Sequence, residues 1–141
     1  MMSADLDCFP ARVDELDNIR DALVARAIAL ALPDRLRATL SLILEELFLN
    51  TVHHGSADEV PIASLTLEQL PRAVQLRYED SGRAHDPFAD VDRAVLAEAG
   101  AARRIGGLGV ILIESLADTT HYERRAERNR ITLTFAVPPA R

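Results

Sequence analysis

The sequence has few aromatic residues and a single cysteine, and both shortages narrow what the protein can be. Aromatic residues make up 4% of its 141 residues and tryptophan is absent, so a core has to be built from aliphatic side chains. One cysteine, Cys8, excludes an internal disulfide framework and suits the reducing cytoplasm. No apolar run approaches the roughly 18 residues of a membrane-spanning helix, and residues 1–5 lack the pattern of a signal peptide. We therefore expect a cytoplasmic protein without a membrane contact.

An excess of positive charge is also missing. The 16 basic residues are outnumbered by 22 acidic ones, which gives a net charge of −6. This balance argues against direct binding of nucleic acid, because non-specific contacts to phosphates depend on positive charge. It does not argue against a small ligand that carries phosphate, since a phosphate site needs only a few local donors. With 48% hydrophobic residues the chain is long enough for one domain, and we expect residues 1–141 to form it.

The spacing of apolar residues predicts a mixture of helices and hairpins. Helical spacing and strand-like alternation occur in separate segments, divided by proline, glycine or polar turns. The predicted helices cover residues 14–32, 34–54 and 108–116, and the predicted strands cover residues 6–9, 62–68, 74–80, 118–124 and 129–137. Hairpins of adjacent strands favour an α+β class, a two-layer α/β sandwich with a mixed, mostly antiparallel sheet and helices on one face.

The segment between the second hairpin strand and the third helix has a different character. Residues 81–107 show no clear period beyond a short helix near residues 91–99. A connection of that length in a compact domain is usually functional, and a lid over a binding site is a common form.

Two polar side chains on the second helix lie at the edge of its apolar face. Glu46 and Asn50 are four residues apart and therefore point the same way, whereas Glu45 is expected to face solvent. The Asn50 carboxamide suits Mg²⁺, a hard cation that takes one or two protein ligands together with phosphate oxygens. A partly buried Glu46 carboxylate suits a general base. Taken alone, the pair is more typical of a helix boundary satisfied by hydrogen bonds.

The turn after the strand at residues 74–80 offers a second candidate. Asp80 closes the strand and Gly82 follows two residues later, a pattern that most often forms an ordinary turn. A buried carboxylate at Asp80 is also suited to accept a hydrogen bond from the amino group of a nucleotide base. Gly82 would then let the backbone approach that base closely.

A glycine turn precedes the last predicted helix. Gly106, Gly107 and Gly109 lie within four positions, and a helix N-terminus with exposed N–H groups favours anions. Arg103 and Arg104 lie just upstream, where a guanidinium reaches a phosphate. A flexible hinge with a solvated charge pair is the plainer interpretation. The Gly-x-x-x-x-Gly-Lys-Ser/Thr pattern of a P-loop is absent, and the histidines and Cys8 match no structural zinc spacing.

Taken in order, the three segments resemble the nucleotide-binding boxes of the GHKL ATPases, the superfamily of gyrase, Hsp90, histidine kinases and MutL. Residues 46–50, with the His54-Gly55 pair, resemble the N box, Asp80-Ser-Gly82 the G1 box, and Gly107-Leu108-Gly109 the G2 box. Length and motif order are most similar to the anti-sigma factor serine kinases of the RsbW type. The resemblance extends over residues 10–137 and implies the Bergerat-type ATP-binding fold.

The resemblance implies a protein serine kinase that uses Mg-ATP to phosphorylate a STAS-domain anti-anti-sigma protein and sequesters a sigma factor, usually as a homodimer. The implied catalytic base is Glu46 and the implied Mg²⁺ ligand is Asn50. The remaining residues implied to bind the nucleotide are Asp80, Gly82, Arg104, Gly107, Leu108, Gly109 and Thr132.

The sequence departs from the family pattern at two positions. Ala84 stands where the G1 box commonly has its last glycine, and Arg104 is one residue out of register with the arginine expected near the γ-phosphate. Two further interpretations therefore stay open. One is a nucleotide-binding partner-switching module without phosphotransfer, and the other is a histidine-kinase catalytic domain fragment.

Overall fold

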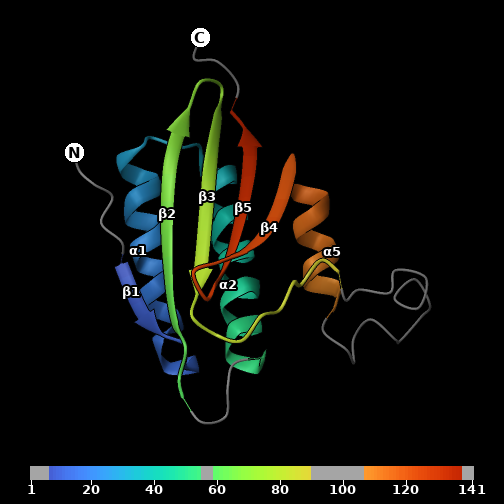
Figure 1. Cartoon of the computed structure of the whole chain (residues 1–141). Helices are drawn as coiled ribbons and strands as arrows, with labels where there is room; N and C mark the ends of the chain where they lie inside the picture. Colours follow the sequence, from blue (N-terminus) through green and yellow to red (C-terminus); the bar gives the residue numbers. More distant parts are fainter. Residues whose placement is uncertain (1–6, 55–58, 90–106, 138–141) are drawn as a thin grey trace.

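The computed structural model describes residues 7–54, 59–89 and 107–137. Within these ranges the chain forms two layers, a five-stranded sheet with three α-helices packed on one of its faces (Figure 1). The predicted α+β sandwich with helices on one face is confirmed, and every strand pairing in the described part is antiparallel. The segment near residues 91–99, predicted to form a short helix, lies outside the described residues.

The sheet has the strand order β1-β2-β3-β5-β4, so the last described strand lies inside the sheet, between β3 and β4. All five strands lie within about two residues of the predicted segments. Their bounds are β1 Asp7–Pro10, β2 Ile62–Leu70, β3 Ala73–Asp80, β4 Thr119–Arg125 and β5 Arg128–Ala136.

The bounds of the three helices lie within three residues of the predicted ones. The first is shorter than predicted, because a 3₁₀ turn at Val13–Glu15 precedes α1 (Leu16–Ala29) and Ala31 adopts a left-handed φ of 57° after it. Helix α2 spans Asp34–His54, as its pattern predicts, and α5 spans Gly107–Leu116. None of the described helices combines the length and apolarity that a membrane crossing requires.

The core lies between the helices and the sheet and is almost wholly aliphatic. Alternate residues of β3 and β5 turn toward the helices, and their apolar side chains are at most 4% exposed. They pack against the apolar stripe of α2 and the buried residues of α1. At the end of the sheet near His54 the inward-facing residues of β3 and β5 change from apolar to polar, because Asp80 and Asn129 occupy paired positions there.

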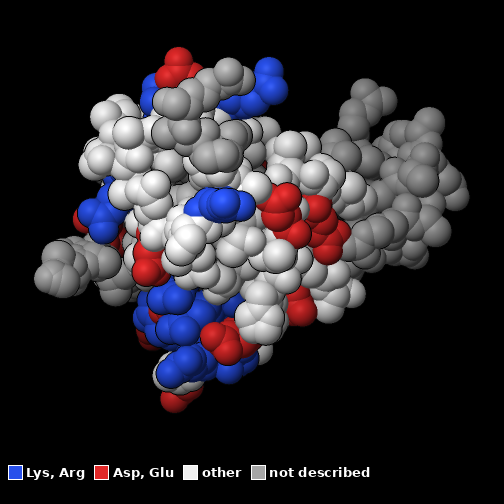
Figure 2. Space-filling view, turned by 90° about the horizontal axis from the view of Figure 1, so that it is seen from above, with Lys and Arg blue, Asp and Glu red and all other residues white. Residues whose placement is uncertain are grey.

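The other face of the sheet carries charged side chains in place of a second helical layer. Glu79 accepts hydrogen bonds from Arg128 and Arg130 at 3.0 and 2.6 Å. Burial alone would raise the pKa of Glu79, but the hydrogen bonds from the two guanidinium groups lower it overall. Figure 2, viewed from above, shows arginines and carboxylates gathered along this side of the molecule.

Candidate functional site

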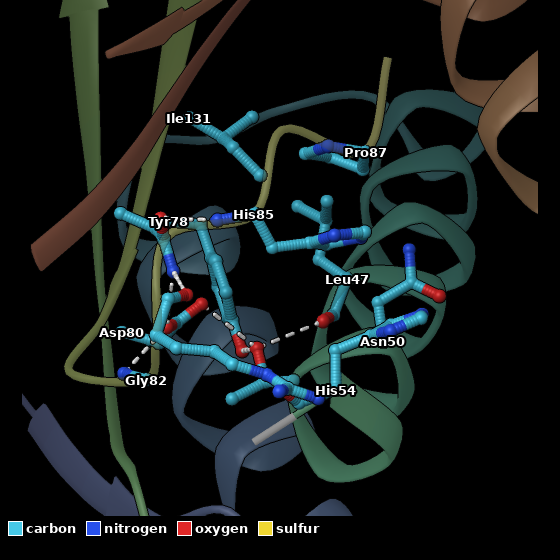
Figure 3. A pocket seen from close by; sticks show the side chains of 12 residues that line it. Leu47, Asn50, His54, Tyr78, Asp80, Gly82, His85, Pro87 and Ile131 are labelled. Carbon is cyan, nitrogen blue, oxygen red and sulfur yellow. Dashed lines mark hydrogen bonds between the residues drawn. The ribbon is translucent and has the colours of Figure 1, made fainter. Parts of the chain in front are cut away.

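A hollow opens where the C-terminal half of α2 meets the ends of β3 and β5 (Figure 3). Helix α2 supplies one wall, the two strands supply the floor, and the loop after β3 supplies the rim. The lining residues are Leu47, Asn50, Thr51, His54, Tyr78, Asp80, Gly82, Arg83, His85, Pro87, Asn129 and Ile131. Two segments that the sequence singled out, around Asn50 and around Asp80, therefore meet in one cavity.

Asp80 is a buried carboxylate at the floor of this cavity, with 7% of its surface exposed. Its Oδ1 accepts hydrogen bonds from the Gly82 backbone N–H and the Asn129 side-chain amide, each at 2.9 Å. Its Oδ2 accepts one from the Thr51 hydroxyl at 3.1 Å. Charge-assisted hydrogen bonds of this kind stabilise a buried carboxylate and fix its orientation.

Thr51 links Asp80 to the core of the domain. Its hydroxyl lies 2.7 Å from the hydroxyl of Tyr78, which is fully buried. Burial raises the pKa of Tyr78 far above its usual value, and the charge on Asp80 raises it further. Tyr78 therefore stays protonated and can donate to Thr51. The Thr51 hydroxyl in turn has two acceptors in reach, Asp80 Oδ2 at 3.1 Å and the Leu47 backbone carbonyl at 3.2 Å.

The two side chains predicted on α2 stand on the same side of the helix, as their spacing requires. Asn50 lines the cavity, and Glu46 lies one turn earlier and is partly buried. Burial raises the pKa of Glu46, and the neighbouring charge on Glu45 raises it further. Glu45, expected to face solvent, has a side chain that is 34% exposed, and its carboxylate accepts a hydrogen bond from the Arg20 guanidinium of α1 at 3.2 Å.

The start of α5 lies directly against Glu46. A Cβ atom placed on Gly109 would come within 1.9 Å of the Glu46 Oε1 atom, so only glycine permits this approach. The helix begins at Gly107, and its first turn therefore meets α2 beside the predicted base. Arg103 and Arg104 lie outside the described residues.

One predicted binding residue lies away from the cavity. Thr132 belongs to β5 between two buried residues, Ile131 and Leu133, and strand alternation turns it to the charged face of the sheet. The structure therefore corrects the expectation that Thr132 supports the base contact. The β5 residue that contacts Asp80 is Asn129, three positions earlier and on the opposite face.

Several residues of the site were not identified from the sequence. Asn129 carried a recognisable signal, because it is a polar residue in register with the buried stripe of Ile131, Leu133 and Phe135. His54 was noted only together with Gly55 in the N-box resemblance, and His85 carried no signal. They stack at the cavity with ring centroids 4.1 Å apart, although 31 positions separate them in the chain.

Comparison with known proteins gives a consistent result. The family model for the histidine kinase-like ATPase domain matches residues 9–135. The serine/threonine-protein kinase BtrW of Bordetella bronchiseptica is 36% identical over 106 residues, a match that covers 74% of each chain.

Solved structures with the same fold include histidine kinases. The catalytic domain of histidine kinase ThkA is 12% identical with a TM-score of 0.52, and the match covers 96% of this chain and 99% of that one. The blue-light activated histidine kinase of Erythrobacter litoralis EL346 is 17% identical with a TM-score of 0.54 over 75% of this chain. This match spans about a third, 32%, of that kinase. The chain belongs to the histidine kinase-like ATPase domain family, of the GHKL type, and this membership implies that it binds ATP.

Proposed function

We propose that this protein is an ATP-dependent protein serine kinase that phosphorylates a STAS-domain anti-anti-sigma protein and also sequesters a sigma factor. The observation that carries the proposal is that the Asp80 carboxylate and the Asn50 carboxamide line one cavity, with the Glu46 carboxylate one helical turn from Asn50. A base contact, a metal ligand and a general base are the three protein groups that such a transfer needs.

In this proposal Asp80 accepts a hydrogen bond from the amino group of adenine. A carboxylate has about four lone-pair positions, and contacts with described residues occupy three of them on Asp80. The donor chemistry of an amino group therefore fits the acceptor that is left. Gly82, buried beside Asp80, leaves room for the base.

Asn50 would hold Mg²⁺ through its side-chain oxygen. The donor set fits this ion, because Mg²⁺ takes few protein ligands and completes its shell with water and phosphate oxygens. A metal that needs three or more protein ligands fits less well, since the described residues contain no cluster of three His, Cys, Asp or Glu side chains. The phosphates would bind to the first turn of α5, at Gly107, Leu108 and Gly109, and to Arg104 upstream.

Glu46 would act as the general base. Burial and the neighbouring Glu45 charge raise its pKa, which makes it a better proton acceptor than an exposed glutamate. The carboxylate would take the proton of the substrate serine as that oxygen bonds to the γ-phosphorus and the bond to the leaving ADP breaks. Phosphoserine and ADP would be the products.

The proposed partners rest on the similarity to BtrW, which is described as a serine/threonine-protein kinase. A STAS-domain protein would be the substrate, a sigma factor the sequestered protein, and a homodimer the assembly. A binding module without phosphotransfer is the second candidate, favoured by Ala84 in the G1 box. Glu46 favours the kinase, because binding alone does not require a base. The alternative of a histidine-kinase catalytic fragment would require a phospho-accepting histidine in another segment or protein.

The test is to incubate the protein with γ-labelled ATP, Mg²⁺ and a candidate STAS-domain protein. Label on a serine of the STAS protein, lost when Glu46→Gln replaces the wild type, is the expected result. ATP binding without label on any serine would support the binding module, and label on histidine would support the histidine-kinase alternative.

A further inference from the structure

Asn129 is the most extensively hydrogen-bonded side chain at the cavity, and only 4% of its surface is exposed. Its Nδ2 amino group donates to Asp80 Oδ1 at 2.9 Å and to the Arg83 backbone carbonyl at 2.8 Å. Both amide hydrogens are therefore used, one to hold the carboxylate and one to hold the loop that follows β3.

The carbonyl oxygen of the same side chain receives three donors. Asn129 Oδ1 lies 2.6 Å from the Tyr122 hydroxyl, 3.1 Å from the His85 backbone N–H and 3.2 Å from Arg124 Nη1. A flipped amide would bring its own N–H groups against these donors and its oxygen against the Asp80 carboxylate. The network therefore admits one orientation of the amide, with its donors directed to Asp80.

This orientation determines what Asp80 can still accept. Its Oδ1 already receives the Asn129 amide and the Gly82 N–H, and its Oδ2 receives the Thr51 hydroxyl. One acceptor position is left, on a carboxylate held from three sides. An acceptor fixed in this way recognises one N–H donor and rejects a carbonyl oxygen, because two acceptors repel each other.

We propose that Asn129 is a positioning residue that fixes the Asp80 carboxylate and thereby sets the preference for a base with an exocyclic amino group. This inference rests on the proposed function, since it concerns the same nucleotide site. Asn129 acts through Asp80 and the loop at residues 81–85, and Tyr122 acts one step further away by holding the Asn129 oxygen.

The experiment compares two ligands on the full chain by titration calorimetry with Mg²⁺. One is ATP, and the other is purine riboside triphosphate, which lacks only the amino group. For the wild type we expect the analogue to bind roughly 10- to 100-fold more weakly, the usual cost of losing a hydrogen bond to a charged group. In Asn129→Leu the ratio of the two dissociation constants should fall to within about threefold of unity, because the Asp80 carboxylate is no longer held in one position.

Two further variants keep the test decisive if Asn129→Leu does not fold. Tyr122→Phe removes one hydroxyl, and its ratio should fall between those of the wild type and Asn129→Leu. Ser64→Ala alters a buried polar residue of β2 that does not line the cavity, and it should keep the wild-type ratio.

The possible outcomes separate the two proposals. A wild type that binds no ATP would refute the proposed function and this inference with it. If the wild type discriminates between the ligands, and Tyr122→Phe and Asn129→Leu keep the same ratio of affinities, this inference alone would be overturned. An equal fall of the ratio in Ser64→Ala would also overturn it, because the effect would then be general loosening of the sheet.

Discussion

Replacing Gly109 with alanine should separate stability from catalysis in this protein. Alanine is the better helix former by up to about 1 kcal/mol, and Gly109 lies in the first turn of α5. The three heavy atoms nearest to the added methyl group all belong to the Glu46 side chain. A flexible side chain can move away at small cost, so we expect a fold at least as stable as that of the wild type.

The geometry sets the size of the displacement. The new Cβ would lie 1.9 Å from Glu46 Oε1 and 2.7 Å from Cδ, whereas ordinary van der Waals contact begins at 3.4 Å. The Glu46 carboxylate must therefore move by about 1.5 Å. A general base contributes about 10²- to 10⁴-fold to a rate, and a displacement of about 1 Å can cost 10²-fold. We expect phosphotransfer to fall by about 10²-fold.

The assay is single-turnover transfer of label from ATP to the partner protein, paired with urea denaturation. The double variant Gly109→Ala/Glu46→Gln provides the control, because two changes that act through one group are not additive. We expect it to be no slower than Glu46→Gln alone. Multiplicative losses in the double variant, or full activity of Gly109→Ala, would refute the argument that the glycine makes room for the base.

Three other substitutions give separate tests. Asn50→Ala should weaken Mg-ATP binding while the thermal midpoint stays near the wild-type value, and unchanged affinity in calorimetry would remove Asn50 as the metal ligand. Glu46→Gln should leave ATP affinity intact and lower phosphotransfer by about 10²-fold or more, so equal turnover would exclude Glu46 from the mechanism. Glu79→Gln should cost up to about 1 kcal/mol of unfolding free energy at neutral pH. Because the pKa of Glu79 is lowered in the folded protein, this difference in unfolding free energy should vanish as the pH falls from the usual 4.5 through that lower pKa. Urea titrations at several pH values measure it. A difference that persists in acid would contradict the ion-pair explanation.

Most of the fold could be predicted because local patterns determine it. Pro33 and the apolar stripe of α2 mark the helix bounds, and strict alternation marks β3 and β5. The first helix was predicted two residues too long at its start and three too long at its end, because a 3₁₀ turn and a left-handed Ala31 do not alter apolar spacing. The order of the strands depends on long-range pairing, which no local pattern contains.

The site was predictable only where residues on one element suffice. Glu46 and Asn50 share a helix face, so their spacing was enough to associate them. The Arg20–Glu45 ion pair joins two helices, and the His54–His85 stack joins a helix to a loop, so neither follows from spacing. Thr132 was misassigned because a strand turns successive residues to opposite faces, and an uncertainty of one position reverses the prediction.

The position of β5 between β3 and β4 has a consequence for how the protein is made. This strand follows the other described strands along the chain, yet it lies between β3 and β4 and carries Asn129 and Ile131 into the cavity. During synthesis the preceding segments leave the ribosome without the strand that joins β4 to the rest of the sheet. The proposed nucleotide site is therefore completed only after β5 is translated, so ATP bound there would stabilise the finished sheet but not its shorter precursors.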